Sequence, residues 1–104
     1  MLQPTQESPL MNLPAFAEFR DRMLASGYDE VIERLWAPST EVERHTHPFE
    51  ANALVVAGEM WLSVADAAAR HLLPGDRFHL QPGVPHEERY GAQGATYWVA
   101  RKAT

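Results

Sequence analysis

The stretch Arg44-His45-Thr46-His47-Pro48-Phe49-Glu50 lies near the middle of the chain and holds two histidines separated by one residue. Side chains alternate across an extended strand, so His45 and His47 would share one face, about 7 Å apart along it. At that spacing two imidazoles can reach one metal ion. A third histidine, His86, ends the run Gly83-Val84-Pro85-His86. Whether the three histidines meet depends on how the rest of the chain folds.

Length and composition describe one ordinary globular domain. A chain of 104 residues, 45% apolar and 22% charged, can bury a single modest core. A formal charge of −5 without any basic run argues against a nucleic-acid or acidic-membrane partner. The absence of cysteine excludes disulfides and cysteine-based zinc sites. Residues 1–14 lack signal-peptide features and no segment reaches membrane-spanning length, so we expect a cytoplasmic protein.

One helix is expected, over residues 14–26. Pro14 suits the first helical position, where its missing N–H costs nothing, and Gly27 suits the left-handed cap. An apolar stripe at helical spacing consists of Phe16, Phe19, Met23 and Leu24. We interpret this helix as a packing element that follows a loose arm over residues 1–13.

After Gly27 the apolar periodicity changes from nearly four to two. Turn signals roughly every eight to twelve residues divide the remainder into short strands. Eight strands are expected, over residues 31–36, 41–47, 51–57, 60–64, 70–73, 77–80, 86–90 and 95–101. This pattern predicts an all-β domain over residues 29–104, a small antiparallel sandwich or barrel, with the arm and helix in residues 1–28.

The chain resembles the cupins, small eight-stranded jelly rolls that carry two short motifs. His45, His47 and Gly58 match the spacing of the first motif, and Gly83 and His86 match the second in register. The resemblance implies a single-domain cupin-like jelly-roll β-barrel with one N-terminal helix. It also implies that the three histidines converge inside the barrel on a divalent transition metal: iron, zinc, nickel, manganese or copper.

The first motif departs from the family pattern at two positions. Its opening glycine would lie at residue 39, which is Ser39, and its ligand glutamate would lie at residue 51, which is Ala51. Glu50 lies one residue early, so simple alternation would turn it away from His47. The missing glutamate bears directly on the metal site.

Three hypotheses remain for the fourth metal ligand. The first is that the protein supplies none, because Ala51 and Ala53 leave room for water or substrate and an open position suits a catalytic site. The second is Glu50, brought inward by a bulge at residues 48–49. The third is Glu88, two residues beyond His86, in a His-x-Glu arrangement similar to that of the pirins, a branch of the cupins. We rank them in that order.

Aromatic and small side chains on the strands are candidates for a ligand pocket, although such residues equally form the core of small sandwiches. The candidates are Phe49, Ala51, Ala53, Trp61, Tyr90, Tyr97 and Trp98. Arginines that could pair with a carboxylate are Arg77, Arg89 and Arg101. We expect His71 to be exposed, and His79 to face away from the core if Phe78 and Leu80 face into it.

The favoured function is a metal-dependent enzyme, a non-haem iron dioxygenase acting on a small organic molecule through a three-histidine site. One alternative is a small-ligand-binding or sensor cupin without turnover. Another is a metal-independent isomerase or epimerase that uses His86 as a base. A small sandwich leaves strand edges to cover, so we also expect a homodimer, formed by strand addition or helix docking.

Overall fold

The computed structural model describes residues 13–103 and consists of one helix and a six-stranded antiparallel system. The elements are α1 (Phe16–Ala25), β1 (Glu30–Trp36), β2 (Glu41–His45), β3 (Phe49–Val64), β4 (Arg70–Leu72), β5 (Arg77–Leu80) and β6 (His86–Ala103). The predicted all-β class with one N-terminal helix is therefore confirmed. The predicted arm lies outside the described residues, apart from Leu13.

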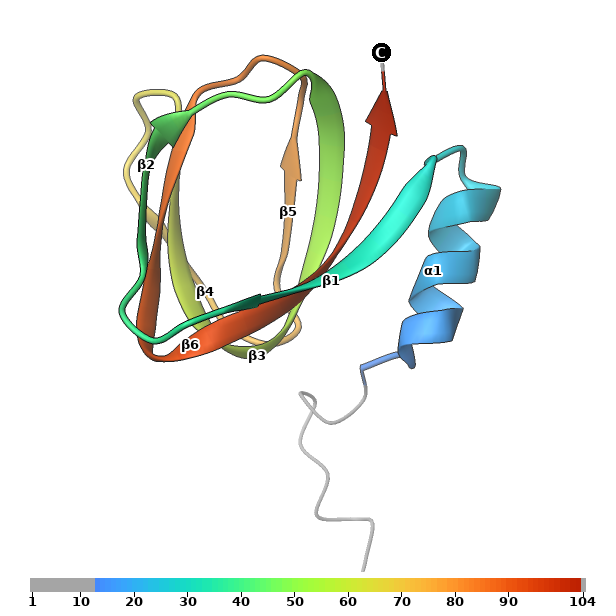
Figure 1. Cartoon of the computed structure of the whole chain (residues 1–104), viewed down its shortest axis with the longest axis horizontal. Coiled ribbons are helices and arrows are strands. Elements are labelled where there is room, and N and C mark those ends of the chain that lie inside the picture. The colour runs from blue at the N-terminus through green and yellow to red at the C-terminus, as the bar shows by residue number, and fades with distance from the viewer. Residues whose placement is uncertain (1–12, 104) are drawn as a thin grey trace, which may run out of the picture.

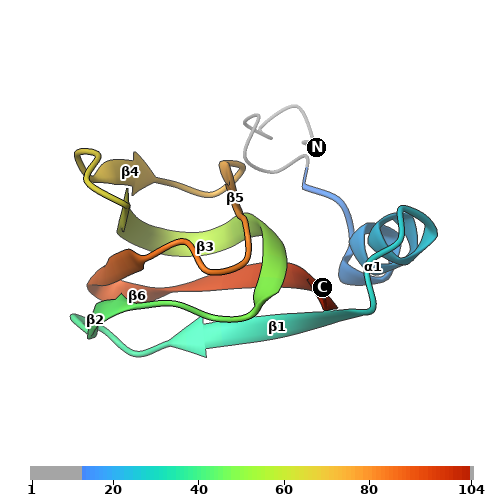
Figure 2. The same ribbon diagram turned by 90° about the horizontal axis from the view of Figure 1, so that it is seen from above.

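Two long strands, β3 and β6, pair with each other, and every other described strand pairs with one of them. They pair from Phe49 with Ala103 at one end to Val64 with His86 at the other. β1 pairs with the second half of β6 and β2 with its first half, whereas β4 and β5 pair with β3. Figures 1 and 2 show these strands curving around a common interior, with α1 outside it beside β1.

Two expected strand breaks are bends within continuous strands. β3 includes both residues 51–57 and residues 60–64, and β6 includes both residues 86–90 and residues 95–101. Gly58 lies at the bend of β3 with φ +74°, and the pairing register shifts on both sides of it. A Cβ atom on Gly58 would overlap the carbonyl oxygen of Gly94. The glycines therefore let two bent strands approach closely, and the pairing continues beyond them.

Alternation along the strands separates an interior face from an outer face. On β3, Ala51, Ala53 and Val55 point inward before the bend, and Met60 and Leu62 do so after it. All five are at most 4% exposed. The other buried members of this interior cluster are Leu72, Phe78, Leu80, Tyr90, Ala95, Tyr97 and Val99. The interior is therefore a packed core, and a metal site must occupy a restricted part of it.

The helix covers part of the outer face. Phe19 and Met23 are buried against Leu54 and Trp98, and the ring centroid of Trp98 lies 5.7 Å from that of Phe19. This confirms that α1 is a packing element. Because Trp98 packs under the helix, it cannot line a pocket inside the barrel, which corrects the expectation for that residue. In the described part of the chain, no helix is long and apolar enough to cross a membrane.

Candidate metal centre

The fold brings His45, His47 and His86 together at one end of the interior, where His86 is buried and His45 and His47 are half-buried. His45, the last residue of β2, lies opposite His86, the first residue of β6, and their ring centroids are 4.3 Å apart. His47 follows in the connection to β3, with its ring centroid 4.9 Å from that of His86 and 6.2 Å from that of His45. The chain thus places three imidazoles around one point, as the metal-site hypothesis requires.

Each of the three imidazoles is oriented by a backbone carbonyl. The Nδ1–H groups donate from His45 to Glu43 O at 2.8 Å, from His47 to Phe49 O at 3.1 Å and from His86 to Val84 O at 2.9 Å. A carbonyl can only accept, so the proton must lie on Nδ1 and the lone pair on Nε2. This tautomer, held by a backbone contact, is the usual state of a histidine metal ligand.

Glu88 supplies a carboxylate to the same cluster. Its Oε2 lies 3.8 Å from Nε2 of His45 and 3.7 Å from Nε2 of His86. One ligand atom from each of these three residues lies within 4.8 Å of the other two. The side chain of Glu88 is only 8% exposed, and its other oxygen accepts a hydrogen bond from the Tyr90 hydroxyl. Glu88, ranked third among the possible fourth ligands, is the glutamate that the fold brings to the histidines.

Burial shifts the pKa values of two groups at the cluster, His47 and Tyr90. The pKa of His47 is lowered mainly by burial and further by His86 and His45, against the opposing effect of the Phe49 carbonyl. The imidazole of His47 is therefore neutral at pH 7. Burial is also the largest cause of the raised pKa of Tyr90, to which Tyr97 and Glu88 contribute. Tyr90 therefore remains a hydrogen-bond donor to Glu88.

The donor set fits a divalent transition metal. Two atoms that each lie about 2.1 Å from one ion are at most about 4.2 Å apart, and the Glu88–histidine separations of 3.7 and 3.8 Å lie within that limit. Imidazole nitrogens with one carboxylate suit iron, manganese, nickel, copper and zinc alike. His45, His86 and Glu88, whose ligand atoms lie within 4.8 Å of one another, would hold the ion, and His47 lies beside His86 as a further candidate ligand.

Glu50 lies outside this cluster, which corrects its place as the second-ranked fourth ligand. No bulge turns it inward: Ala51 takes the interior position and Glu50 takes the outer one. Its Oε2 accepts hydrogen bonds from Nε2 of His79 at 2.6 Å and from the Tyr28 hydroxyl at 3.0 Å. His79 therefore also lies on the outer face, as expected once Phe78 faces the core.

A cavity of about 130 Å³ adjoins the metal-site residues. Besides the histidines and Glu88, it is lined by Arg34, Trp36, Val42, Phe49, Ala51, Leu80, Tyr97, Val99 and Arg101. Phe49 and Ala51 thus lie where the pocket hypothesis placed them, and the Phe49 ring stacks on His47 at 4.0 Å. Ala53 and Tyr90, also pocket candidates, belong to the core behind this lining. The sequence analysis did not identify Arg34 as a pocket residue. Arg34 lies two residues from both Ile32 and Trp36, which face inward, so alternation along the strand could have predicted its orientation.

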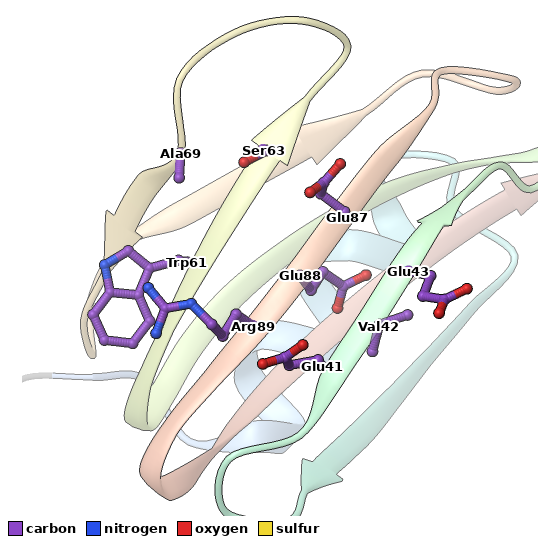
Figure 3. A pocket seen from close by; sticks show the side chains of 9 residues that line it. All are labelled: Glu41, Val42, Glu43, Trp61, Ser63, Ala69, Glu87, Glu88 and Arg89. Carbon is purple, nitrogen blue, oxygen red and sulfur yellow. The ribbon is translucent and has the colours of Figure 1, made fainter.

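Trp61 lies on the outside of the barrel, which corrects its assignment to the pocket. Its neighbours Met60 and Leu62 point inward, so Trp61 points outward and stacks on His71 with ring centroids 4.5 Å apart. The guanidinium of Arg89 lies 4.1 Å from the Trp61 ring centroid. A hollow of about 280 Å³ lies between β2, β3 and β6, and Figure 3 shows Trp61 and Arg89 among the side chains that line it. The hollow and the histidine cavity share Val42 and Glu88 as lining residues, so the two adjoin between β2 and β6.

Comparisons with known proteins agree on the fold. No family model matches the sequence, and neither does any curated protein. Among solved structures, the RmlC-like cupin from Shewanella frigidimarina is 24% identical, with a TM-score of 0.61 over 71% of this chain and 66% of that chain. The DMSP lyase DddQ from Ruegeria pomeroyi is 25% identical, with a TM-score of 0.61 over 70% of this chain and 36% of that chain.

Oxalate decarboxylase from Bacillus subtilis is 18% identical, with a TM-score of 0.65 over 81% of this chain and 24% of that chain. The chain thus spans between about a quarter and two thirds of the length of these three structures. Because cupins and double-stranded β-helix proteins recur among its neighbours, the chain has the cupin fold.

Proposed function

We propose that this chain, a cupin by fold, binds a divalent transition metal through His45, His47, His86 and Glu88 and acts on a small organic molecule. The observation that carries the proposal is that His45, His86 and Glu88 offer ligand atoms within 4.8 Å of one another, with the His47 ring centroid 4.9 Å from that of His86. Neighbouring structures with this fold include enzymes, among them the oxalate decarboxylase whose Mn(II) centres have been characterised. That precedent supports a metal-dependent reaction here without defining it.

The reaction we test first is oxygenation by a non-haem iron centre. A bound iron ion would supply the redox chemistry that dioxygen activation needs. The chain's own residues have three tasks: backbone carbonyls fix the imidazoles, Tyr90 orients Glu88, and the apolar lining limits the access of water. The carboxylate is an addition to the three-histidine site that we expected from the sequence, and it would leave fewer positions for substrate.

Metal binding is tested by elemental analysis of the protein after incubation with Fe(II), Mn(II) or Zn(II) and desalting. We expect a stoichiometric amount of metal in the wild type and little in His86→Ala. His71→Ala is the matched control, because the same side chain is removed from the outer face, where His71 stacks on Trp61. Equal metal content in the wild type and in His86→Ala would contradict the proposed site.

Turnover is tested by oxygen consumption with the Fe(II)-loaded protein and a panel of thiols, diketones, catechols and small carboxylic acids. We expect uptake that depends on one of these compounds and is lost in His86→Ala. Saturable binding of a compound without oxygen uptake or product would instead assign the cavity to a binding protein. In that case the metal site would stand and the dioxygenase reaction would not.

A further inference from the structure

Two arginines face the cavity beside the metal-site residues. Arg34 comes from β1 and Arg101 from the second half of β6, so both belong to the wall that also carries Tyr97. Neither guanidinium belongs to the donor set, and the proposed metal chemistry leaves both without a role. Cavity-facing cations beside a cationic metal need an explanation, because like charges inside a small barrel repel.

Arg101 is held in place but is poorly neutralised. Its side chain is 25% exposed, and its guanidinium carbon lies 4.8 Å from the ring centroid of Phe49, the ring that stacks on His47. Its ion pair with Glu30 is 3.6 Å long, and Glu30 is 53% exposed, so this pair contributes little. The buried Nε of Arg101 has no hydrogen-bond partner. A buried donor without a partner costs free energy unless a ligand satisfies it.

Arg34 is positioned in a similar way further along the same wall of β1 and β6. Its guanidinium carbon lies 4.7 Å from the ring centroid of Trp36, and Trp36 stacks on Tyr90 at 4.9 Å. Tyr90 in turn donates its hydroxyl to Glu88. Within residues 13–103, Arg34 makes no hydrogen bond or ion pair with a carboxylate. Arg101 thus contacts the cluster through the Phe49 ring, and Arg34 does so through the Trp36 and Tyr90 rings. The guanidinium N–H groups of Arg34 remain available to a ligand.

The charges and the size of the cavity restrict the ligand. Glu88 is the one acidic side chain among the described residues that line the cavity, whereas two arginines face it. Guanidinium groups match carboxylates geometrically and can bind them through two parallel hydrogen bonds. A cavity of about 130 Å³ is well below the size of pockets that hold drug-sized ligands.

We propose that the cavity recognises a small organic dicarboxylate, with one carboxylate directed to the metal and the other held by Arg34 and Arg101. This inference deepens the proposed function and rests on it for the metal-facing end of the ligand. The binding of the second carboxylate by Arg34 and Arg101 requires no metal ion. Arg34 and Arg101 are accordingly specificity-determining residues of the cavity.

The test is calorimetric titration of malonate, succinate, acetate and inorganic phosphate into the metal-free and the Mn(II)-loaded protein. We expect a dicarboxylate to bind more tightly than acetate or phosphate to the loaded protein. Arg34→Gln and Arg101→Gln should each weaken dicarboxylate binding about 10- to 100-fold while leaving the metal content unchanged. Arg34→Lys keeps the positive charge but loses the planar guanidinium that can donate two parallel hydrogen bonds, so it should retain part of the affinity.

Arg89→Gln is the matched control, because Arg89 lies over Trp61 on the outer face, and it should bind dicarboxylates like the wild type. A wild-type protein that binds no metal would overturn the proposed function. Dicarboxylate binding by the metal-free protein that weakens in the arginine variants would still support the arginine site. Three results would overturn the inference: no saturable dicarboxylate binding in either form, affinities unchanged in both arginine variants, or phosphate binding as tight as malonate binding.

Discussion

At the scale of single residues, Tyr90 decides which oxygen of Glu88 faces the histidines. Its hydroxyl, kept protonated by burial, donates to one oxygen and leaves the other within 3.8 Å of two imidazole nitrogens. Tyr90, which is itself outside the cavity lining, thereby orients the proposed carboxylate ligand. Such supporting contacts commonly change metal affinity about 10- to 100-fold when they are lost.

Glu88→Gln should therefore lower the affinity for Mn(II) or Zn(II) by at least about tenfold, because the amide keeps the shape of the side chain and removes its charge. Competition with a chromophoric chelator measures the change. Glu50→Gln is the same substitution on the outer face, where Glu50 binds His79 and Tyr28, and should leave the affinity unchanged. Equal losses in both variants would contradict the assignment of Glu88 as the carboxylate ligand.

Glu50 should instead affect stability in acid. Its pKa is lowered from 4.5, first by the hydrogen bond from His79 and next by that from Tyr28. A lowered folded-state pKa gives stability that is present above pH 4.5 and is lost as the pH falls through the folded value. Urea midpoints should therefore decrease between about pH 5 and about pH 3 more steeply in the wild type than in Glu50→Gln. Parallel pH profiles would contradict this contribution.

The site was predictable from the sequence as far as the histidine motif extends. His45, His47 and His86 are named by spacing and by the resemblance, and the strand pairing does bring them together. The glutamate was not predictable, because the choice between Glu50 and Glu88 depends on strand phase. That phase is fixed by long-range pairing, which places Ala51 opposite Leu80 in the interior. A shift of one residue would have exchanged the two faces.

At the scale of elements, the bend of β3 at Gly58 allows β3 and β6 to approach closely. Gly58→Ala should lower the free energy of unfolding by about 3 kcal/mol or more. Two costs combine: the left-handed backbone disfavours a side chain, and the new Cβ atom would overlap the Gly94 carbonyl oxygen. Gly83 is the control: it has φ +78°, but a Cβ there would meet no atom within 4 Å, so Gly83→Ala should cost only about 1 to 2 kcal/mol. Chemical denaturation measures both. Similar costs would mean that the close approach of the strands contributes nothing.

Turn signals were the least reliable part of the sequence reasoning about elements. Glycines at residues 58, 91 and 94 resemble strand ends, yet both strands continue through them because each strand bends together with its partner. The reverse holds at Ser39, which adopts φ +58° in the turn between β1 and β2. Ser39 stands where the motif that the sequence resembles would have a glycine, and its left-handed backbone conformation is one that glycine adopts most readily.

At the scale of the whole molecule, β1 is one of the four described strands that pair with a single neighbour, with β2, β4 and β5, and it is the edge that we expect a second chain to bind. It stands at the end of the strand order and pairs with β6 alone in the part of the chain that the structure describes. Leu35, near the end of β1, is 71% exposed, the most exposed of the large apolar side chains on the described surface. Unpaired strand edges favour the addition of another strand. We therefore expect a homodimer formed by β1 against β1 of a second copy.

Light scattering at micromolar concentration should give the mass of two wild-type chains and the mass of one chain for Leu35→Lys, because a charge on the edge strand opposes strand addition. Leu73→Lys is the matched control, since Leu73 is 43% exposed and follows β4 rather than β1. It should remain dimeric. A wild type that is monomeric would contradict the dimer, and dissociation of the Leu73 variant alone would move the interface from β1 to the β4 side of the barrel.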